Sequence, residues 1–218
     1  MKKFKKLLAG IMTLAMLVTM LPATVLAGET KVEYNGAEYA TITEAVAKVN
    51  EDGVANAELI IYGEQIVNKG VWFDTATQVV IKGAAKDTAK IILKDDADRA
   101  GKYGNHSSKT EQPTGFSLEN AASGSITISD LTIENQKTLG HHSNGAWRET
   151  YYTYAYANDV DYVNVDFIGG VTTSSGTNAD FEKCNFTEDD SQWYCLYIDQ
   201  EYSNADVTIN IKECTFNP

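Results

Sequence analysis

Cysteine is scarce in this 218-residue sequence, which holds three cysteines: Cys184, Cys195 and Cys214. So few cysteines, in an odd number, cannot provide a disulfide framework for an exported protein, so the core must hold without cross-links. Cys184 and Cys214 occupy equivalent positions of the repeat described below, which would place them about 4.8 Å apart on neighbouring strands. Small buried thiols are the favoured interpretation, and a disulfide between these two stays open.

Positive charge is also scarce, because 18 Lys and Arg oppose 30 Asp and Glu, for a net charge of -12. Only two arginines occur, Arg99 and Arg148. An acidic surface repels phosphate backbones and anionic lipids, so nucleic-acid binding and peripheral membrane binding are not expected. A divalent cation or a neutral polymer is the easier partner.

The one long hydrophobic run lies at the N-terminus, from Leu7 to about Val25, behind four lysines. Small residues follow it, so the sequence predicts a secretory signal peptide over residues 1–27. A transmembrane anchor is the competing interpretation, but Pro22 interrupts the run and no charged cluster follows it. Cleavage would leave an acidic chain of net charge -16, with no membrane span, secreted or displayed at the cell surface.

Helical periodicity is confined to one short segment of the mature chain. Thr41 and Glu44 have the spacing of a capping box, in which each side chain satisfies an unpaired backbone N–H. The apolar residues that follow at helical spacing are Ile42, Ala45, Val46 and Val49. Turn formers and a glycine at residues 50–53 end the helix. Residues 28–56 are therefore expected to form an N-terminal cap with a short α-helix.

Residues 57–218 have the texture of an all-β domain, with short β-rich runs separated by turns. The early runs are residues 58–62, 71–73, 78–82 and 90–94. Four later segments share one pattern: two inward residues at period two, one polar turn residue, then two more inward residues at period two. The turn residues of the four copies are Asp130, Asn164, Lys183 and Glu213.

The polar turn residue resets the pleat, so apolar side chains before and after it point into one interior. Repetition of such a unit is what coiling a chain into stacked rungs requires. A third run per coil lies between the copies, at residues 116–118, 151–156, 171–173 and 193–199. We therefore expect a right-handed, single-stranded parallel β-helix with three strands per turn and loops of variable length outside it.

Three strings carry a family resemblance: Leu131–Asn135, Ala179–Phe186 and Lys212–Phe216. They resemble the "I-T-F-E-N" and "F-x-N-C-x-F" rungs of pectate lyases, pectin methylesterases and bacterial surface β-helix proteins. The stretch from Val79 to Leu93 is similar to an early "strand, Gly, x, K-T-I-I" rung of the same group. The resemblance implies the pectin-lyase fold, and it implies little about activity because this scaffold serves many functions.

The methylesterase activity of this group is not expected here. Val165–Gly169 resembles the string that carries the methylesterase nucleophile, but Asp166 lies at an outward position of the repeat, in the column of Thr132, Asn185 and Thr215. Matching the rungs in order places the family's catalytic positions near Val171–Thr172 and Trp193, which cannot do acid or nucleophile chemistry.

A calcium-dependent lyase of acidic polysaccharides is the alternative enzymatic hypothesis, and it needs converging carboxylates and a base. Residues 95–98 hold three aspartates near Arg99, and Asp159, Asp161 and Asp166 lie on one coil. Solvated acidic surface is the favoured interpretation of both clusters. No cofactor is expected, unless the lyase alternative holds, in which case calcium would bind.

A groove between two loops is the candidate ligand site. The loop at residues 141–149 holds two of the three histidines, and the loop at residues 101–115 holds the third. Both precede third-run strands and should project on the same side. Aromatic faces beside a carboxylate suit sugar rings, and the candidate ligand-binding residues are Trp147, Arg148, Tyr151, Trp193, Tyr197 and Asp199.

The favoured function is a non-catalytic module that binds a polysaccharide or a cell-surface glycan, or that acts in adhesion. The C-terminal end of the sequence adds a further expectation, because the fourth repeat ends at Phe216 and only two residues of this sequence follow it, without a capping segment. An open rung exposes apolar side chains and strand edges. A truncated chain, or contact with another chain through this rung, is the resulting hypothesis.

Overall fold

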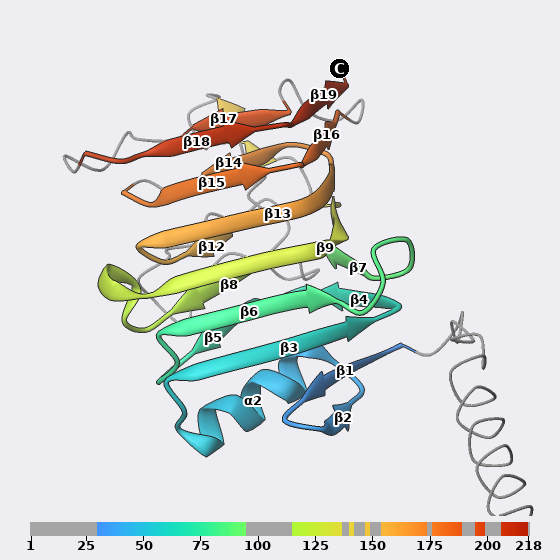
Figure 1. Ribbon diagram of the computed structural model, residues 1–218, viewed down its shortest axis with the longest axis vertical. Coiled ribbons are helices and arrows are strands. Elements are labelled where there is room, and N and C mark those ends of the chain that lie inside the picture. Colours follow the sequence, from blue (N-terminus) through green and yellow to red (C-terminus); the bar gives the residue numbers. More distant parts are fainter. Residues whose placement is uncertain are drawn as a thin grey trace, which may run out of the picture.

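The chain folds as a mostly β-strand structure with one α-helix among the described residues (Figure 1). The computed structural model describes residues 30–94, 115–136, 140–141, 147–148, 154–173, 176–188, 195–198 and 206–217. Its elements are β1 (Lys31–Tyr34), β2 (Ala37–Tyr39), α2 (Ile42–Asp52), β3 (Asn56–Tyr62), β4 (Glu64–Val67), β5 (Gly70–Phe73), β6 (Gln78–Gly83), β7 (Lys90–Leu93), β8 (Gly115–Leu118), a 3-10 turn (Ala121–Ser123), β9 (Ser125–Asn135), β10 (Gly140–His141), β11 (Trp147–Arg148), β12 (Tyr154–Tyr156), β13 (Asp159–Ile168), β14 (Val171–Thr173), β15 (Asn178–Glu182), β16 (Asn185–Thr187), β17 (Leu196–Ile198), β18 (Ile209–Lys212) and β19 (Thr215–Asn217).

The expected capping helix is confirmed as α2. The Glu44 N–H donates to Thr41 Oγ1 at 3.2 Å, while the Glu44 carboxylate accepts from the Ala40 N–H at 3.1 Å. The buried Gln65 side chain on β4 accepts a hydrogen bond from the Ile42 N–H at 3.2 Å. A second backbone N–H of the first helical turn, which has no partner within the helix, is therefore hydrogen-bonded. Gly53 ends the helix in the left-handed region, with φ 63°. The helix lies at one end of the stacked strands (Figure 1).

The cap also holds a hairpin that the sequence reading missed. Strands β1 and β2 pair antiparallel, and β1 pairs antiparallel with β3. Asn35 and Gly36 form the turn, with φ 51° and 74°. An Asn-Gly pair between strands is the standard signal of this turn, because both central positions need positive φ. The sheets are therefore mixed, and their antiparallel pairs lie in the cap and between β10 and β11.

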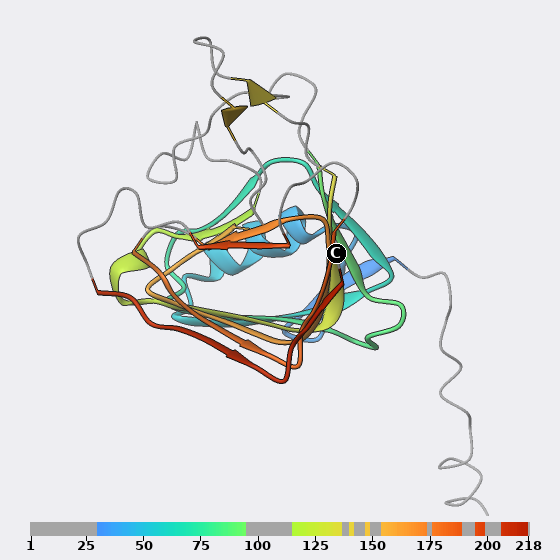
Figure 2. The same cartoon turned by 90° about the horizontal axis from the view of Figure 1, so that it is seen from above.

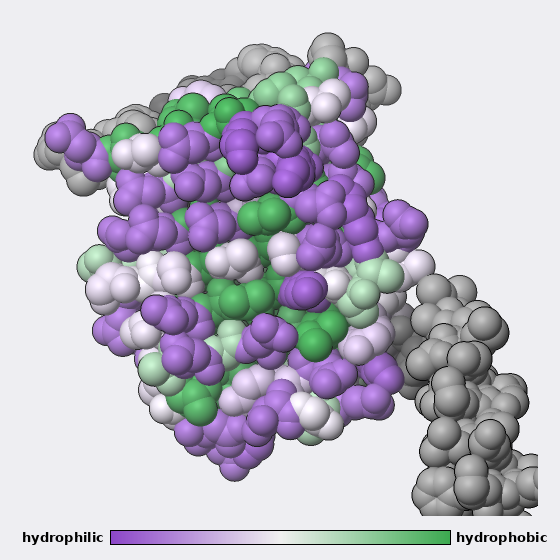
Figure 3. Space-filling model, in the orientation of Figure 1, coloured by the Kyte–Doolittle hydropathy of each residue, from purple (hydrophilic) through white to green (hydrophobic). Residues whose placement is uncertain are grey.

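Two sets of parallel strands share the long strands β9 and β13. The first sheet runs in the order β18-β15-β13-β9-β6-β3. The second set pairs β4 with β7, β7 with β9, β9 with β13, β13 with β16, and β16 with β19. Figure 1 shows these strands stacked one above another in sequence order. The outward face of the first sheet is hydrophilic over its upper strands and mixed lower down (Figure 3).

The third set of strands is present in two pieces. Strand β8 pairs in parallel with β5 and β12, and β14 pairs in parallel with β17. These strands match the third run expected from the sequence, with shorter bounds at residues 154–156 and 196–198. Viewed from above, the three sets of strands enclose one interior (Figure 2).

The interior holds the inward residues that the repeat predicts. The first three copies of the repeat contain twelve inward residues, of which eleven are aliphatic or aromatic and one is Cys184. Each of these twelve side chains is at most 3% exposed. Aromatic rings stack through successive copies, with centroids 5.0 Å apart for Tyr162 and Phe181 and for Phe167 and Phe186. The fourth copy keeps the register, but Ile211 and Phe216 are 46% and 45% exposed. The contact with another chain expected at this end stays a prediction.

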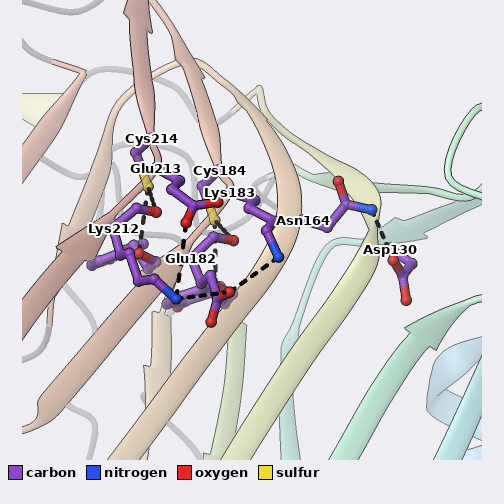
Figure 4. Close-up of polar contacts among 10 residues, drawn as sticks. Asp130, Asn164, Glu182, Lys183, Cys184, Lys212, Glu213 and Cys214 are labelled. Atoms are coloured by element: carbon purple, nitrogen blue, oxygen red, sulfur yellow. Dashed lines mark hydrogen bonds and ion pairs between the residues drawn. The ribbon is translucent and has the colours of Figure 1, made fainter.

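The four polar turn residues all have left-handed backbone. Asp130, Asn164, Lys183 and Glu213 have φ between 54° and 56°. They occupy the same position in four successive copies of the repeat, and Asn164 Nδ2 donates to Asp130 Oδ1 at 2.8 Å (Figure 4). Each left-handed residue reverses the pleat once, which confirms the expected bend and explains why apolar residues on both sides of it face inward.

Lysine has no local hydrogen bond that favours left-handed backbone, unlike Asn and Asp. We expect Lys183→Gly to raise the free energy of unfolding by about 0.5–1 kcal/mol, because relief of left-handed strain exceeds the entropy cost of glycine. Lys183→Val should lower it, since a β-branched side chain tolerates this conformation least. Urea unfolding curves measure both changes, and a glycine variant less stable than the wild type would contradict the assigned turn.

The two stacked cysteines are free thiols. Cys184 is buried and Cys214 is half-buried. Each Sγ donates to a backbone carbonyl, that of Tyr162 at 3.4 Å for Cys184 and that of Phe181 at 3.4 Å for Cys214. Burial raises the pKa of the Cys184 thiol to about 11, so this group is an inert core residue at neutral pH.

Candidate functional site

The outward face of the first sheet gathers polar side chains in columns, because parallel strands in register place equivalent residues side by side. Asp161 of β13 lies between Thr127 of β9 and Asp180 of β15. Asp180 in turn lies beside Asn210 of β18. A parallel column runs through Asp159 and Asn178. We refer to Asp159, Asp161, Asn178, Asp180 and Asn210 as the carboxylate ladder.

Carboxamides hold the carboxylates of the ladder in place. Asn178 Nδ2 donates to Asp159 Oδ1 at 2.9 Å, and Asn210 Nδ2 donates to Asp180 Oδ1 at 2.7 Å. Asn158 Nδ2 donates to the second Asp159 oxygen at 2.8 Å. Thr127 Oγ1 donates to Asp161 Oδ2 at 3.4 Å.

Two carboxylate oxygens of the ladder accept no hydrogen bond from the described residues. Within the described residues, Asp161 Oδ1 and Asp180 Oδ2 accept no hydrogen bond, and neither side chain forms an ion pair. Burial raises the pKa of the Asp161 carboxyl, and the charge of Asp180 raises that pKa further. The hydroxyl of Thr127 acts in the opposite direction. The pair is therefore a site of uncompensated negative charge that a hydroxyl donor or a cation would stabilise.

This raised pKa gives a pH-dependent effect of Asp161→Asn on stability. The Asp161 carboxyl has a higher pKa in the folded state than in the unfolded state, where it is about 3.9. The protonated group therefore adds to the free energy of unfolding below about pH 3.9, and this contribution is lost as the pH rises through the pKa of the folded state. Asp161→Asn should raise Tm at pH 7, and the gain should shrink toward pH 3. Calorimetry at both pH values tests this, with Asp87→Asn, on the exposed loop between β6 and β7, as the control that should leave Tm nearly unchanged. A gain that grows in acid would contradict the assignment.

The carboxylate of Asp166 does not belong to the ladder. It lies in the outward column of Thr132 and Asn185 on the second set of strands, which confirms its predicted position. Lys86 Nζ lies 2.9 Å from its Oδ1, and Asn185 Nδ2 donates to the same oxygen at 2.6 Å. The grouping of Asp166 with Asp159 and Asp161 is therefore wrong in space, because the bend at Asn164 turns the chain between them.

Most of the groove predicted from the sequence lies outside the described residues. Tyr197, on β17, is 43% exposed and pairs in register with Thr172, but the adjacent Ile198 is equally exposed at 44%, so the outward direction of Tyr197 stays a prediction. Leu196 packs against the core as expected. Trp147 and Arg148 form β11, but their side chains are not described. Three groove residues lie outside the described ranges: Tyr151, Trp193 and Asp199. Arg99 and the three aspartates before it also lie outside them.

The described residues contain no group of three or more His, Cys, Asp or Glu side chains arranged to hold a metal ion. Over the same residues, no helix has the length and apolar character needed to cross a membrane. The carboxylate ladder was missed in the sequence because its pairing depends on register between strands 19 and 30 residues apart. Comparisons with protein-family models, with curated proteins and with solved structures find no match.

Proposed function

We propose that this chain is a right-handed parallel β-helix that is secreted or displayed at the cell surface and that binds carbohydrate without catalysing a reaction. The fold part of the proposal is supported by the parallel, sequential pairing of strands in three sets. The right hand follows the general preference of parallel crossover connections.

The open oxygens of Asp161 and Asp180 carry the proposal of carbohydrate binding. They lie on neighbouring strands of one sheet face, so they present acceptors side by side to the hydroxyl edge of a sugar. Half-buried Val80 and Val163 and the hydroxyl of Ser129 lie on the same outward face. A few fixed polar groups beside apolar surface are what a saccharide with hydroxyl edges and C–H faces requires.

The aromatic groove remains a second part of this proposal. It consists of Trp147, Arg148, Tyr151, Trp193, Tyr197 and Asp199, and the exposure of Tyr197 supports it. Aromatic rings there would stack on sugar faces.

A glycan array of neutral and acidic oligosaccharides tests the proposal. We expect the wild type to bind at least one neutral glycan and the double variant Asp161→Asn, Asp180→Asn to lose most of that binding. Asp87→Asn is the matched control, since this exposed carboxylate lies on the loop between β6 and β7. Loss in Trp193→Ala alone would place binding in the groove, and a wild type that binds no glycan would overturn the proposal.

A calcium-dependent lyase of acidic polysaccharides is the second candidate function, favoured by the adjacent carboxylates of Asp161 and Asp180. A divalent cation between them would relieve the charge that raises the pKa of Asp161. Among the described residues, no lysine, arginine or histidine forms an ion pair with either carboxylate. Calcium-dependent formation of unsaturated product from polygalacturonate, lost in Asp180→Asn, would favour this function over simple binding.

A further inference from the structure

A hollow of about 410 Å³ lies at the cap end of the first sheet, where β1 and β3 meet the hairpin turn. Strands β6 and β9 separate this end from the carboxylate ladder on β13 and β15. Its volume is in the range of sites for small organic ligands. The residues used below line it: Glu33, Asn35, Val54, Asn56, Glu58 and Ile60.

The hollow differs from the rest of the cap in its charge balance. Lys31 pairs with Glu38 at 2.6 Å, and Lys48 pairs with Asp52 at 2.8 Å and with Glu51 at 3.0 Å. Every carboxylate in these pairs lies outside the lining of the hollow.

Glu33 and Glu58, the two carboxylates that line the hollow, form no ion pair with a described lysine, arginine or histidine. Glu33 accepts a hydrogen bond from the neutral Tyr62 hydroxyl at 3.2 Å. Glu58 is exposed and makes no hydrogen bond or ion pair within the described ranges. No lysine, arginine or histidine lines the hollow. An anion would therefore be repelled, while a cation would find two carboxylates that form no ion pair within the described residues, although Lys31 lies near Glu33, with its Nζ 5.1 Å from the centre of the Tyr62 ring.

We propose that this hollow binds an organic cation, a primary ammonium group carried on a sugar-sized body. An ammonium group has three donors, which suit two carboxylates and a carboxamide oxygen of Asn35 or Asn56. Val54 and Ile60 are half-buried and supply apolar surface for the body of the ligand. A bare metal ion fits less well, because the described residues hold no group of three metal-ligating side chains. The site is independent of the carboxylate ladder and of the function proposed for it.

The test is an NMR titration at pH 6 with a glucosamine disaccharide, which carries free ammonium groups, and with its N-acetylated counterpart. We expect the free-amine sugar to bind and to shift the backbone amide signals of Asn35, Gly36 and Asn56. Glu58→Gln should weaken binding about tenfold, as expected for the loss of one charge-assisted hydrogen bond. Thermal melting of Glu58→Gln should match the wild type, because the residue is exposed.

Glu51→Gln is the matched control, because it removes the same charge from the cap outside the hollow, and it should bind within about twofold of the wild type. The double variant Asp161→Asn, Asp180→Asn should also keep full affinity, which separates this proposal from that for the ladder. Equal binding of the N-acetylated sugar, shifts confined to other residues, or unchanged affinity in Glu58→Gln would each overturn the proposal.

Discussion

Gly83→Ala should lower the free energy of unfolding by about 3 kcal/mol, a large share of the stability of a domain of this size. Gly83 is the last residue of β6, and the left-handed turn at Asp130 lies against it. An added Cβ would overlap the carbonyl oxygen of Asp130 and lie 2.8 Å from Ala89 Cβ. Backbone on one side and a buried side chain on the other cannot move aside cheaply, so the strain falls on the stacking of β6 against β9.

Gly36→Ala is the control for this prediction. It lies at φ 74° with nothing within 4 Å of an added Cβ, so it should cost only the backbone strain of about 1–2 kcal/mol. Guanidinium unfolding of both variants measures the difference. If Gly83→Ala were no more costly than Gly36→Ala, the turn at Asp130 could not lie against β6 as described.

Phe181→Ala should cost about 3–5 kcal/mol, because it removes a fully buried ring from the middle of the stacked copies. The Phe181 ring is 1% exposed. It stacks on Tyr162 at 5.0 Å and meets Phe186 edge-on at 5.5 Å. A cavity at this point removes ring contacts with both β13 and β16.

Phe216→Ala is the matched change in the last copy. Its ring stacks on Phe186 at 4.7 Å but is 45% exposed, so we expect a loss of about 1 kcal/mol. Calorimetric unfolding of the two variants gives the comparison. Equal losses would mean that the last copy is covered in solution, contrary to the exposure described for Ile211 and Phe216.

The repeat was predictable because its signal is local. Alternation at period two on either side of a polar residue, as around Asn164, identifies the inward positions without knowledge of the partners. The left-handed conformation follows from the need to reverse the pleat, even at Lys183 and Glu213, where residue preference argues against it. The Asn35-Gly36 hairpin has an equally local turn signal, but strands of four and three residues are too short to show a clear alternation of their own.

The carboxylate ladder could not be predicted in the same way. Asp159, Asp161 and Asp166 are close in sequence, yet the bend at Asn164 sends Asp166 to a different set of strands. The actual neighbour of Asp161 is Asp180, which is reached only when the register of β13 and β15 is known. Burial of Asp161 is likewise a tertiary property, so its raised pKa has no sequence signal.

The most direct test of the central claim, that the outward face of the first sheet binds carbohydrate, is a titration followed through the side-chain amide NMR signals of Asn178 and Asn210. These groups donate to Asp159 and Asp180, so a sugar seated on the ladder must change their surroundings. With an oligosaccharide that the wild type binds on the array, both signals should shift in proportion to occupancy. Binding of that oligosaccharide with both signals unmoved would contradict the claim.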